Sequence, residues 1–290
     1  MVFDSIGQLV SFCEETDKPL WEAVLEASCE EAGIDEITSR SVMRGRLDAM
    51  RAADGSYREC DRSASGLSGG DGAKMEKYYS SGRSISGDLI GRILSGALRM
   101  GECNACMHRI VAAPTAGACG VIPAVLLAYA DKYGTNDEEL VNALYVTAGI
   151  GAVIAQRASV SGAEAGCQAE IGSASAMAAA ALVYLHGGTP RQMADASAIA
   201  LKNMMGLVCD PVAGLVEVPC VKRNAAGAMN ALTAAELALA GIESRIPVDE
   251  VIDTMRIVGD ALPVSLKETG MGGIAASRTG KQLKKEIFGK

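Results

Sequence analysis

Residues 161–182 read SGAEAGCQAEIGSASAMAAAAL, and this stretch decides the class of fold. After Gly166 it is dominated by alanine, serine and glycine, with Glu170 as its one charged residue. Alanine is the strongest helix former, and a helix without a charged face is normally buried. We therefore expect a buried helix here, which its neighbours can approach closely because its side chains are small.

The sequence on either side extends this interpretation. Between residues 111 and 235 only 15 of 125 residues are charged, whereas the other 165 residues hold 47 charges. The middle is therefore predicted to be a buried core, with the two ends as its solvated cover. Few windows alternate as strands do, and VEVP at 216–219 is too short to form a sheet. The predicted fold class is all-α, with Gly/Pro-rich loops joining many helices.

Local signals divide the chain along its length. Asp17 and Pro19 are helix-start signals and Gly33 is a stop signal; Thr189 before Pro190 caps another helix, and Thr279 is expected to cap the last one. The expected organisation is a small helical N-terminal region at 1–53, a Gly/Ser-rich loop at 54–87 and a compact all-helical domain at 88–290.

Composition excludes several classes of protein. The formal charge of −8 argues against nucleic acid or an anionic membrane as a partner. The N-terminus has an acid at Asp4 and no basic segment, so we expect no secretory signal. Nine cysteines, an odd number, favour a reducing cytoplasm over a disulfide framework. The uncharged runs at 110–130, 140–156 and 171–190 are rich in small residues and predict buried helices of a soluble protein, with no membrane span.

Three cysteines lie at predicted helix edges beside glycine or proline. Cys209 and Cys220 bracket the interruption VCDPVAGLVEVPC at 208–220, and Cys167 follows Gly166. Metal sites favour ligands on backbone that can turn. The separations of 42 and 11 residues match no short ferredoxin-type run, so the residues alone leave open that these are buried thiols acting as small apolar groups.

Two further motifs carry alternatives. CNACMH at 103–108 could serve thiol redox chemistry or form half of a zinc site, but no second pair accompanies it, and we expect it on one continuous helix over 89–113. APTAGACGV at 113–121 is a Gly-rich turn that opens a helix. Its free N–H groups would suit a carboxylate or phosphate, or the turn could simply be a tight helix–helix contact.

Acid–base groups are few in the uncharged middle of the chain. The two histidines, His108 and His186, belong to no recognisable triad. Four central carboxylates could transfer protons: Glu164, Glu170, Asp210 and Glu217.

Taken together, the blocks at 113–126, 161–182 and 201–225 resemble the α subunit of the iron–sulfur-dependent bacterial L-serine dehydratases. The resemblance runs nearly end to end and includes GLSGGDGAK at 66–74, SRIPVDEVIDTM at 244–255 and KETGMGGIAASRTG at 267–280.

The resemblance implies a [4Fe–4S] cluster held by Cys167, Cys209 and Cys220. It also implies that an iron without a protein ligand acts as a Lewis acid on the serine hydroxyl, giving pyruvate and ammonia. The family's base comes from a β chain, which nothing in this sequence resembles, so the catalytic base stays unknown and a β subunit is the expected partner. Our hypothesis for the substrate carboxylate is the turn formed by Thr115, Ala116, Gly117 and Ala118.

Other functions remain to be weighed against this one. The same site could expel sulfide from L-cysteine instead of water from serine. A pyridoxal-phosphate enzyme would need a Schiff-base lysine in an α/β fold, and no strand pattern supports one. From a different class, the chain could be a non-catalytic helical scaffold, or a structural zinc protein that uses Cys103, Cys106 and His108.

Overall fold

A computed structural model describes residues 3–289 of the chain. Within these residues the regular elements are thirteen α-helices joined by short helical turns, and no strand is formed. The single β-type contact in this part of the chain is an isolated bridge between Cys209 and Lys267. The all-α prediction is confirmed, and VEVP at 216–219 forms a turn.

The elements follow one another closely along the chain. The α-helices are α1 (Ile6–Thr16), α2 (Leu20–Ala32), α3 (Glu36–Gly55), α4 (Asp71–Ser80), α5 (Gly87–Ala105), α6 (Val121–Tyr133), α7 (Asp137–Arg157), α8 (Gly162–Ala165), α9 (Ser173–Leu185), α10 (Pro190–Met204), α11 (Cys220–Leu239), α12 (Val248–Ala261) and α13 (Arg278–Phe288). The short turns are η1 (Ala116–Ala118), η2 (Gln168–Gly172), η3 (Val212–Gly214), η4 (Val264–Leu266) and η5 (Gly273–Ala276).

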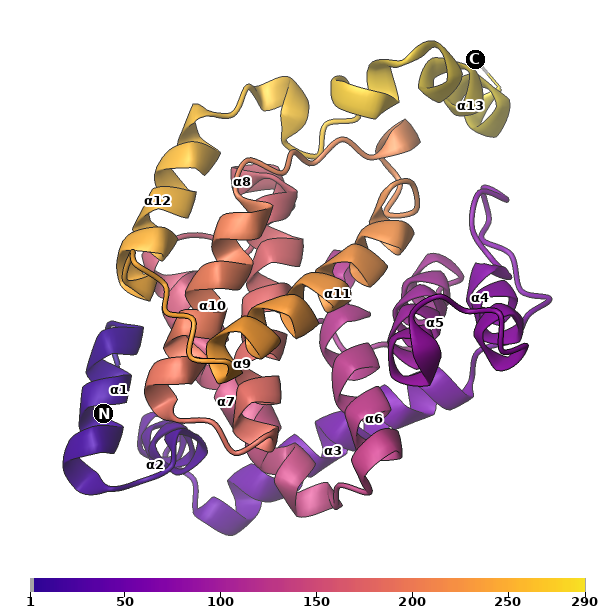
Figure 1. Ribbon diagram of the computed structural model, residues 1–290. Coiled ribbons are helices and arrows are strands. Elements are labelled where there is room, and N and C mark those ends of the chain that lie inside the picture. The colour runs from indigo at the N-terminus through magenta and orange to yellow at the C-terminus, as the bar shows by residue number, and fades with distance from the viewer. Residues whose placement is uncertain (1–2, 290) are drawn as a thin grey trace.

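Helix α9 lies at the centre of the molecule, and α6, α7, α10 and α11 pack around it (Figure 1). Every residue from Ser173 to Val183 is buried, as the alanine-rich sequence predicts. Glycines bring neighbouring helices close: an added Cβ at Gly227 would lie 2.7 Å from Ile171, and one at Gly151 would lie 2.7 Å from Met177. Small residues therefore set the helix spacing in this core.

The N-terminal helices cover one side of this core. Helix α2 ends at Gly33, which has a φ of +64° that suits glycine, and both α2 and α3 pack on α7. The Gly/Ser-rich segment 54–87 carries α4, whose first amides donate hydrogen bonds to the buried Glu102 carboxylate on α5. This carboxylate fixes the start of α4 against α5.

Two local predictions are wrong. The helix expected over 89–113 ends at Ala105, because the chain turns at Met107, where φ is +63°. The last helix is capped by Ser277 and not by Thr279, since the Ser277 side chain accepts a hydrogen bond from the amide of Gly280. The capping box at Thr189 on α10 is confirmed.

Helix α7 is long and apolar enough to cross a membrane by length and composition, but 72% of its apolar window is buried inside the fold. A helix that is apolar on all sides and covered by other helices is a core helix of a globular protein. Helices α2, α3, α9 and α12 are among the elements that cover it.

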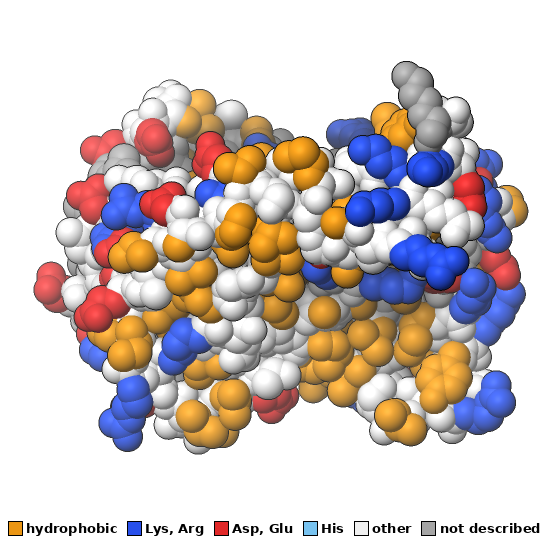
Figure 2. Space-filling view, turned by 90° about the horizontal axis from the view of Figure 1, so that it is seen from above, with side chains coloured by type: hydrophobic (Ala, Val, Ile, Leu, Met, Phe, Trp, Pro, Cys, Tyr) orange, Lys and Arg blue, Asp and Glu red, His pale blue; other side chains and the backbone are white. Residues whose placement is uncertain are grey.

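The face at the top of Figure 1 is formed in part by the C-terminal elements. Lysine and arginine side chains gather on one side of this face, where α13 lies, while apolar side chains cross its middle (Figure 2). Lys281, Lys284 and Lys285 of α13 are exposed, as are Val264 and Met271 nearby in the chain. The net negative charge of the chain is therefore not evenly spread.

Candidate functional site

The three cysteines of the predicted metal site come from three separate segments. Cys167 lies between α8 and η2, Cys209 lies in the loop after α10, and Cys220 is the first residue of α11. Their exposed fractions are 1%, 2% and 6%, so all three thiols are buried.

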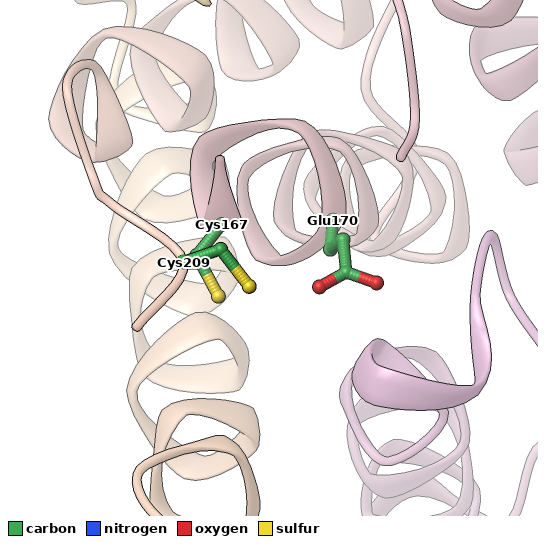
Figure 3. A group of neighbouring side chains, drawn as sticks. All are labelled: Cys167, Glu170 and Cys209. Atoms are coloured by element: carbon green, nitrogen blue, oxygen red, sulfur yellow. The ribbon is translucent and has the colours of Figure 1, made fainter. Parts of the chain in front are cut away.

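Two of these thiols meet directly beside a carboxylate. The sulfur atoms of Cys167 and Cys209 and a carboxylate oxygen of Glu170 all lie within 4.8 Å of one another. Cys167 directly precedes the π-helical turn η2 and Glu170 lies within it, three residues further on. Figure 3 shows both side chains on the same side of this turn. Such a group of ligand atoms could hold a metal ion.

The backbone of Cys209 is fixed by the C-terminal segment. Its amide donates to the carbonyl of Leu266 at 2.8 Å, and its carbonyl accepts from the amide of Glu268 at 2.8 Å. Segment 264–276 therefore forms one wall of the site, although it lies more than 50 residues further along the chain.

Cys220 lies outside the tightest group of ligand atoms but close to it. Burial raises the pKa of its thiol to about 12, and the charges of Cys167 and Glu170 add to this rise. Asn224 on the same helix donates to the carbonyl of Cys220 at 3.0 Å and to that of Gly117 at 2.8 Å, and Gly117 lies against Glu170, so the start of α11 borders the same site. The peptide between Val218 and Pro219, just before it, is cis.

Arg223 supplies positive charge next to the thiols. Its guanidinium donates to the carboxylate of Asp210 at 2.9 Å and to the carbonyl of Val208 at 2.8 Å. A hydrogen bond from Cys209, together with Arg223, holds the pKa of the Cys167 thiol below its usual range despite burial. The same thiol–thiol hydrogen bond, with burial, raises the pKa of Cys209. Arg223 therefore places positive charge where a thiolate at Cys167 would be stabilised.

Asp210 joins the loop that carries Cys209 to helix α11 and to the turn η5. It is 3% exposed and accepts hydrogen bonds from Arg223 on α11 and from the amide of Ile274 in η5. An added Cβ at Gly273 would lie 2.2 Å from a carboxylate oxygen of Asp210, and Gly273 has a φ of +56°. Only glycine fits both requirements at that position.

The turn at 115–118 opens onto the same site. An added Cβ at Gly117 would lie 3.2 Å from a carboxylate oxygen of Glu170. The amide of Ala118 donates within the turn to Thr115, whereas the amides of Ala116 and Gly117 have no hydrogen-bond partner in residues 3–289. The carbonyl of Gly117 is held by Asn224 at 2.8 Å. Two free N–H groups thus lie beside the carboxylate.

Two polar groups of this site lack full partners. The Thr115 hydroxyl is buried without a hydrogen bond of normal geometry. Glu170 is 9% exposed and forms no ion pair within the described part of the chain. Burial raises the pKa of the Glu170 carboxyl, the nearby Thr115 hydroxyl partly offsets this, and the charge of Glu268 raises it further.

The other candidate residues are not part of this group. His108 pairs with Asp61 at 3.2 Å, and the ligand atoms of Cys103, Cys106 and His108 do not gather into a metal-binding group in residues 3–289. His186 contacts the hydroxyl of Tyr129 at 3.1 Å. The remaining carboxylates are also occupied: Glu164 accepts from Ser159, and Glu217 accepts from Ser63 and Ser65.

The sequence interpretation missed Arg223, Asn224 and Glu268. The first two could have been found, because they follow Cys220 by three and four residues on one helix and therefore share its face. Glu268 gives no such signal, since it reaches the site only through the backbone pairing with Cys209.

Comparison with known proteins identifies the relatives of this chain. Residues 15–275 match the family described as serine dehydratase alpha chain. The chain belongs to this family. It is 48% identical to the probable L-serine dehydratase alpha chain of Bacillus subtilis over 99% of this chain and 96% of that protein. It is 42% identical to the L-serine dehydratase alpha chain of Peptoniphilus asaccharolyticus, over 99% of each chain.

Longer members of the family also match. The L-serine dehydratase TdcG of Escherichia coli is 45% identical over 69% of this chain, a match that covers 45% of that protein. The family resemblance expected from the sequence is therefore confirmed. The two alpha chains match along almost their whole length, whereas the Escherichia coli protein contains further sequence outside the match.

Proposed function

We propose that this chain is the metal-bearing α subunit of an L-serine dehydratase, which converts L-serine to pyruvate and ammonia with a [4Fe–4S] cluster. The proposal is supported by the meeting of Cys167 and Cys209 beside Glu170, with Cys220 buried at the start of α11, in a chain of the serine dehydratase alpha chain family.

The residues present fit such a cluster. Thiolates are the ligands that iron–sulfur clusters use, and each thiolate binds a different iron, so three cysteines need not crowd around one point. The space beside them is kept open by Gly162, where an added Cβ would lie 3.1 Å from the sulfur of Cys209. Three protein ligands leave one iron free, and when bound the cluster supplies a Lewis acid for the departure of the substrate hydroxyl.

The residues of this chain would bind and orient the substrate. The free amides of Ala116 and Gly117 and the hydroxyl of Thr115 are the donors for the substrate carboxylate; the amide of Ala118 is already used within the turn. Amides at the start of a helical turn suit an anion. Arg223 keeps positive charge beside Cys167, which favours the thiolate that a metal requires.

The catalytic base belongs to a partner chain in this proposal. His108 and His186 contact Asp61 and Tyr129 and belong to no group with the three cysteines in residues 3–289, which supports a base from outside this chain. The names of the relatives, "alpha chain", support a β subunit as the partner. A reducing cytoplasm is the proposed compartment, because all nine cysteines are free.

Reconstitution without oxygen tests the cluster. The chain is loaded with iron and sulfide, and the visible absorbance and the iron and sulfide contents are measured. We expect the cluster in the wild type and in Cys103→Ser, and none in a variant with serine at positions 167, 209 and 220. A metal-free scaffold would show no absorbance in any variant, and a zinc site at 103–108 would make Cys103→Ser the damaging change.

A pyruvate assay tests the reaction. The loaded chain is combined with its β subunit and given L-serine or L-cysteine side by side. We expect pyruvate from L-serine in the complex and none from the α chain alone. Faster pyruvate and sulfide release from L-cysteine would contradict the proposed substrate and identify a desulfidase.

A further inference from the structure

The Glu170 carboxylate is nearly buried and forms no ion pair with any of the residues that the structure describes. Its exposed fraction is 9%, and within residues 3–289 no lysine, arginine or histidine forms an ion pair with it. Burying a carboxylate without a compensating charge is costly. Such a carboxylate at the wall of a site therefore favours a positively charged ligand, because the ligand's charge offsets the cost of burial.

The surroundings of Glu170 make this need stronger. The negative charge of Glu268 raises the pKa of the Glu170 carboxyl. The sulfur atoms of Cys167 and Cys209 lie within 4.8 Å of one of its carboxylate oxygens. The nearby cation Arg223 is already held by Asp210 and by a backbone carbonyl. Within the described part of the chain, Glu170 therefore pairs with no cation.

The carboxylate also lies against glycine backbone on two sides. An added Cβ would lie 3.2 Å from a Glu170 oxygen at Gly117 and 2.7 Å at Gly162. The side near Gly117 is the turn whose amides at Ala116 and Gly117 are free. A carboxylate and a pair of unused N–H donors are thus neighbours. The Thr115 hydroxyl, also without a normal hydrogen bond, directly precedes the two amides in the chain and lies near Glu170.

We infer that Glu170 binds the α-ammonium group of the amino-acid substrate, while the amides of Ala116 and Gly117 bind its α-carboxylate. The two opposite charges of an α-amino acid are separated by a single carbon atom, and this site offers the two matching partners side by side. The inference rests on the proposed function for the reaction, but it concerns only how an amino acid is recognised. Glu170 is then a binding residue that selects amino acids over hydroxy acids.

Two other roles for Glu170 predict different results. As a ligand of the metal it would be needed for iron loading, because its oxygen lies with the sulfurs of Cys167 and Cys209. As a purely structural group it would affect every ligand equally. Glu170→Gln separates these roles, because it keeps the size of the side chain and removes only its charge.

The experiment compares two ligands that differ in one group. L-serine and 3-hydroxypropanoate share the carboxylate and the hydroxyl, but only L-serine has the ammonium. The KM for L-serine, the inhibition constant of 3-hydroxypropanoate and the binding of both by calorimetry are measured on the loaded complex with its β subunit. The control variant is Glu164→Gln, which changes an exposed carboxylate in α8 that contacts only Ser159 among its hydrogen-bond partners.

We expect Glu170→Gln to weaken the binding of L-serine by about 10- to 100-fold, because one charge-assisted hydrogen bond is lost. The inhibition constant of 3-hydroxypropanoate and the iron content stay unchanged, and Glu164→Gln behaves as the wild type. Equal weakening of both ligands, an unchanged KM for L-serine, or loss of iron in Glu170→Gln would overturn the inference.

The failure of the proposed function would look different. A wild-type complex that binds L-serine but makes no pyruvate contradicts the dehydratase reaction, and the calorimetric comparison of the two ligands then still decides the role of Glu170. A wild-type complex that makes pyruvate while Glu170→Gln keeps its affinity for L-serine contradicts the inference alone.

Discussion

The Thr115 hydroxyl is buried at the start of η1, where it makes no hydrogen bond of normal geometry. Leaving a buried hydroxyl without a partner costs about 1–3 kcal/mol, so such groups are rare unless a ligand or water satisfies them. Its neighbours are the free amides of Ala116 and Gly117. At the scale of single residues, this turn therefore has hydrogen-bonding groups that a ligand could satisfy.

Thr115→Val tests that role. The change keeps the shape of the side chain and removes the hydroxyl, so we expect the KM for L-serine to rise about tenfold while the free energy of unfolding does not fall. Steady-state kinetics and thermal unfolding measure the two effects. Thr254→Val is the control, because Thr254 is exposed on α12 and bonds only to its own helix. An unchanged KM in Thr115→Val would exclude substrate binding by this hydroxyl.

Some residues of the site could be predicted from the sequence and others could not. Cys167 and Cys209 stand out because glycine and proline interrupt an otherwise uncharged helical chain beside them. Glu170 was one of four central carboxylates, and nothing in its local sequence separates it from Glu164. Only the fold shows that one is buried beside the thiols while the other is exposed and bonded to a serine.

At the scale of helices, glycine decides how closely two of them approach. Gly149 on α7 faces α2, and an added Cβ would lie 2.4 Å from a methyl carbon of Val24. Gly45 lies inside α3 with nothing within 4 Å of the same position. The two glycines have helical backbones, so they differ in packing and not in conformation.

Replacing each of these glycines by alanine should therefore have opposite effects. Gly149→Ala is expected to lower the free energy of unfolding by about 1–3 kcal/mol, since it overpacks the contact between α7 and α2. Gly45→Ala should raise it by up to about 1 kcal/mol through helix propensity alone. Denaturant unfolding of the two variants measures both. A stabilising Gly149→Ala would show that α2 can move away without cost.

The buried pair of Asp210 and Arg223 connects three elements. Asp210→Ala leaves Arg223 without its carboxylate and frees the amide of Ile274. We expect the free energy of unfolding of the iron-free chain to fall by about 3 kcal/mol, the effect of breaking a buried pair from one side. Asp253→Ala, which removes the half-exposed partner of Arg157, should cost less than about 1 kcal/mol. Similar losses in the two variants would contradict the connecting role of Asp210.

The elements themselves were largely predictable, because periodic small residues and strong caps act locally. The stop at Gly33 and the cap at Thr189 depend only on their neighbours in the chain. One error arose where two local signals compete: Ser277 and Thr279 can both cap a helix, and the helix capped by Ser277 begins two residues earlier. The end of α5 at Ala105 could not be predicted, because no glycine or proline directly follows it in the sequence.

At the scale of the whole molecule, the proposed metal site lies where the core meets the C-terminal segment. Helices α9 and α11 belong to the central packing, whereas segment 264–276 is hydrogen-bonded to Cys209 and Asp210 and packs on η3 (Figure 1). The pairing of these distant segments could not be predicted from the sequence, because it rests on two backbone hydrogen bonds and one buried carboxylate. A group bound by the cysteines would therefore stabilise the edge more than the centre.

Removal of iron should loosen this edge and leave the core intact. A cluster binds only the folded arrangement of its ligands, so its loss removes stability from the segments that supply and cover them. We expect amide hydrogen exchange to accelerate at 207–219 and 264–276 in the iron-free chain, while α7 and α9 exchange as slowly as before. The variant with serine at 167, 209 and 220 should exchange like the iron-free wild type whether or not iron is added. Uniform acceleration that includes α9 would mean that the cluster supports the whole fold, and no acceleration at either segment would mean that the cysteines hold no group that matters for stability.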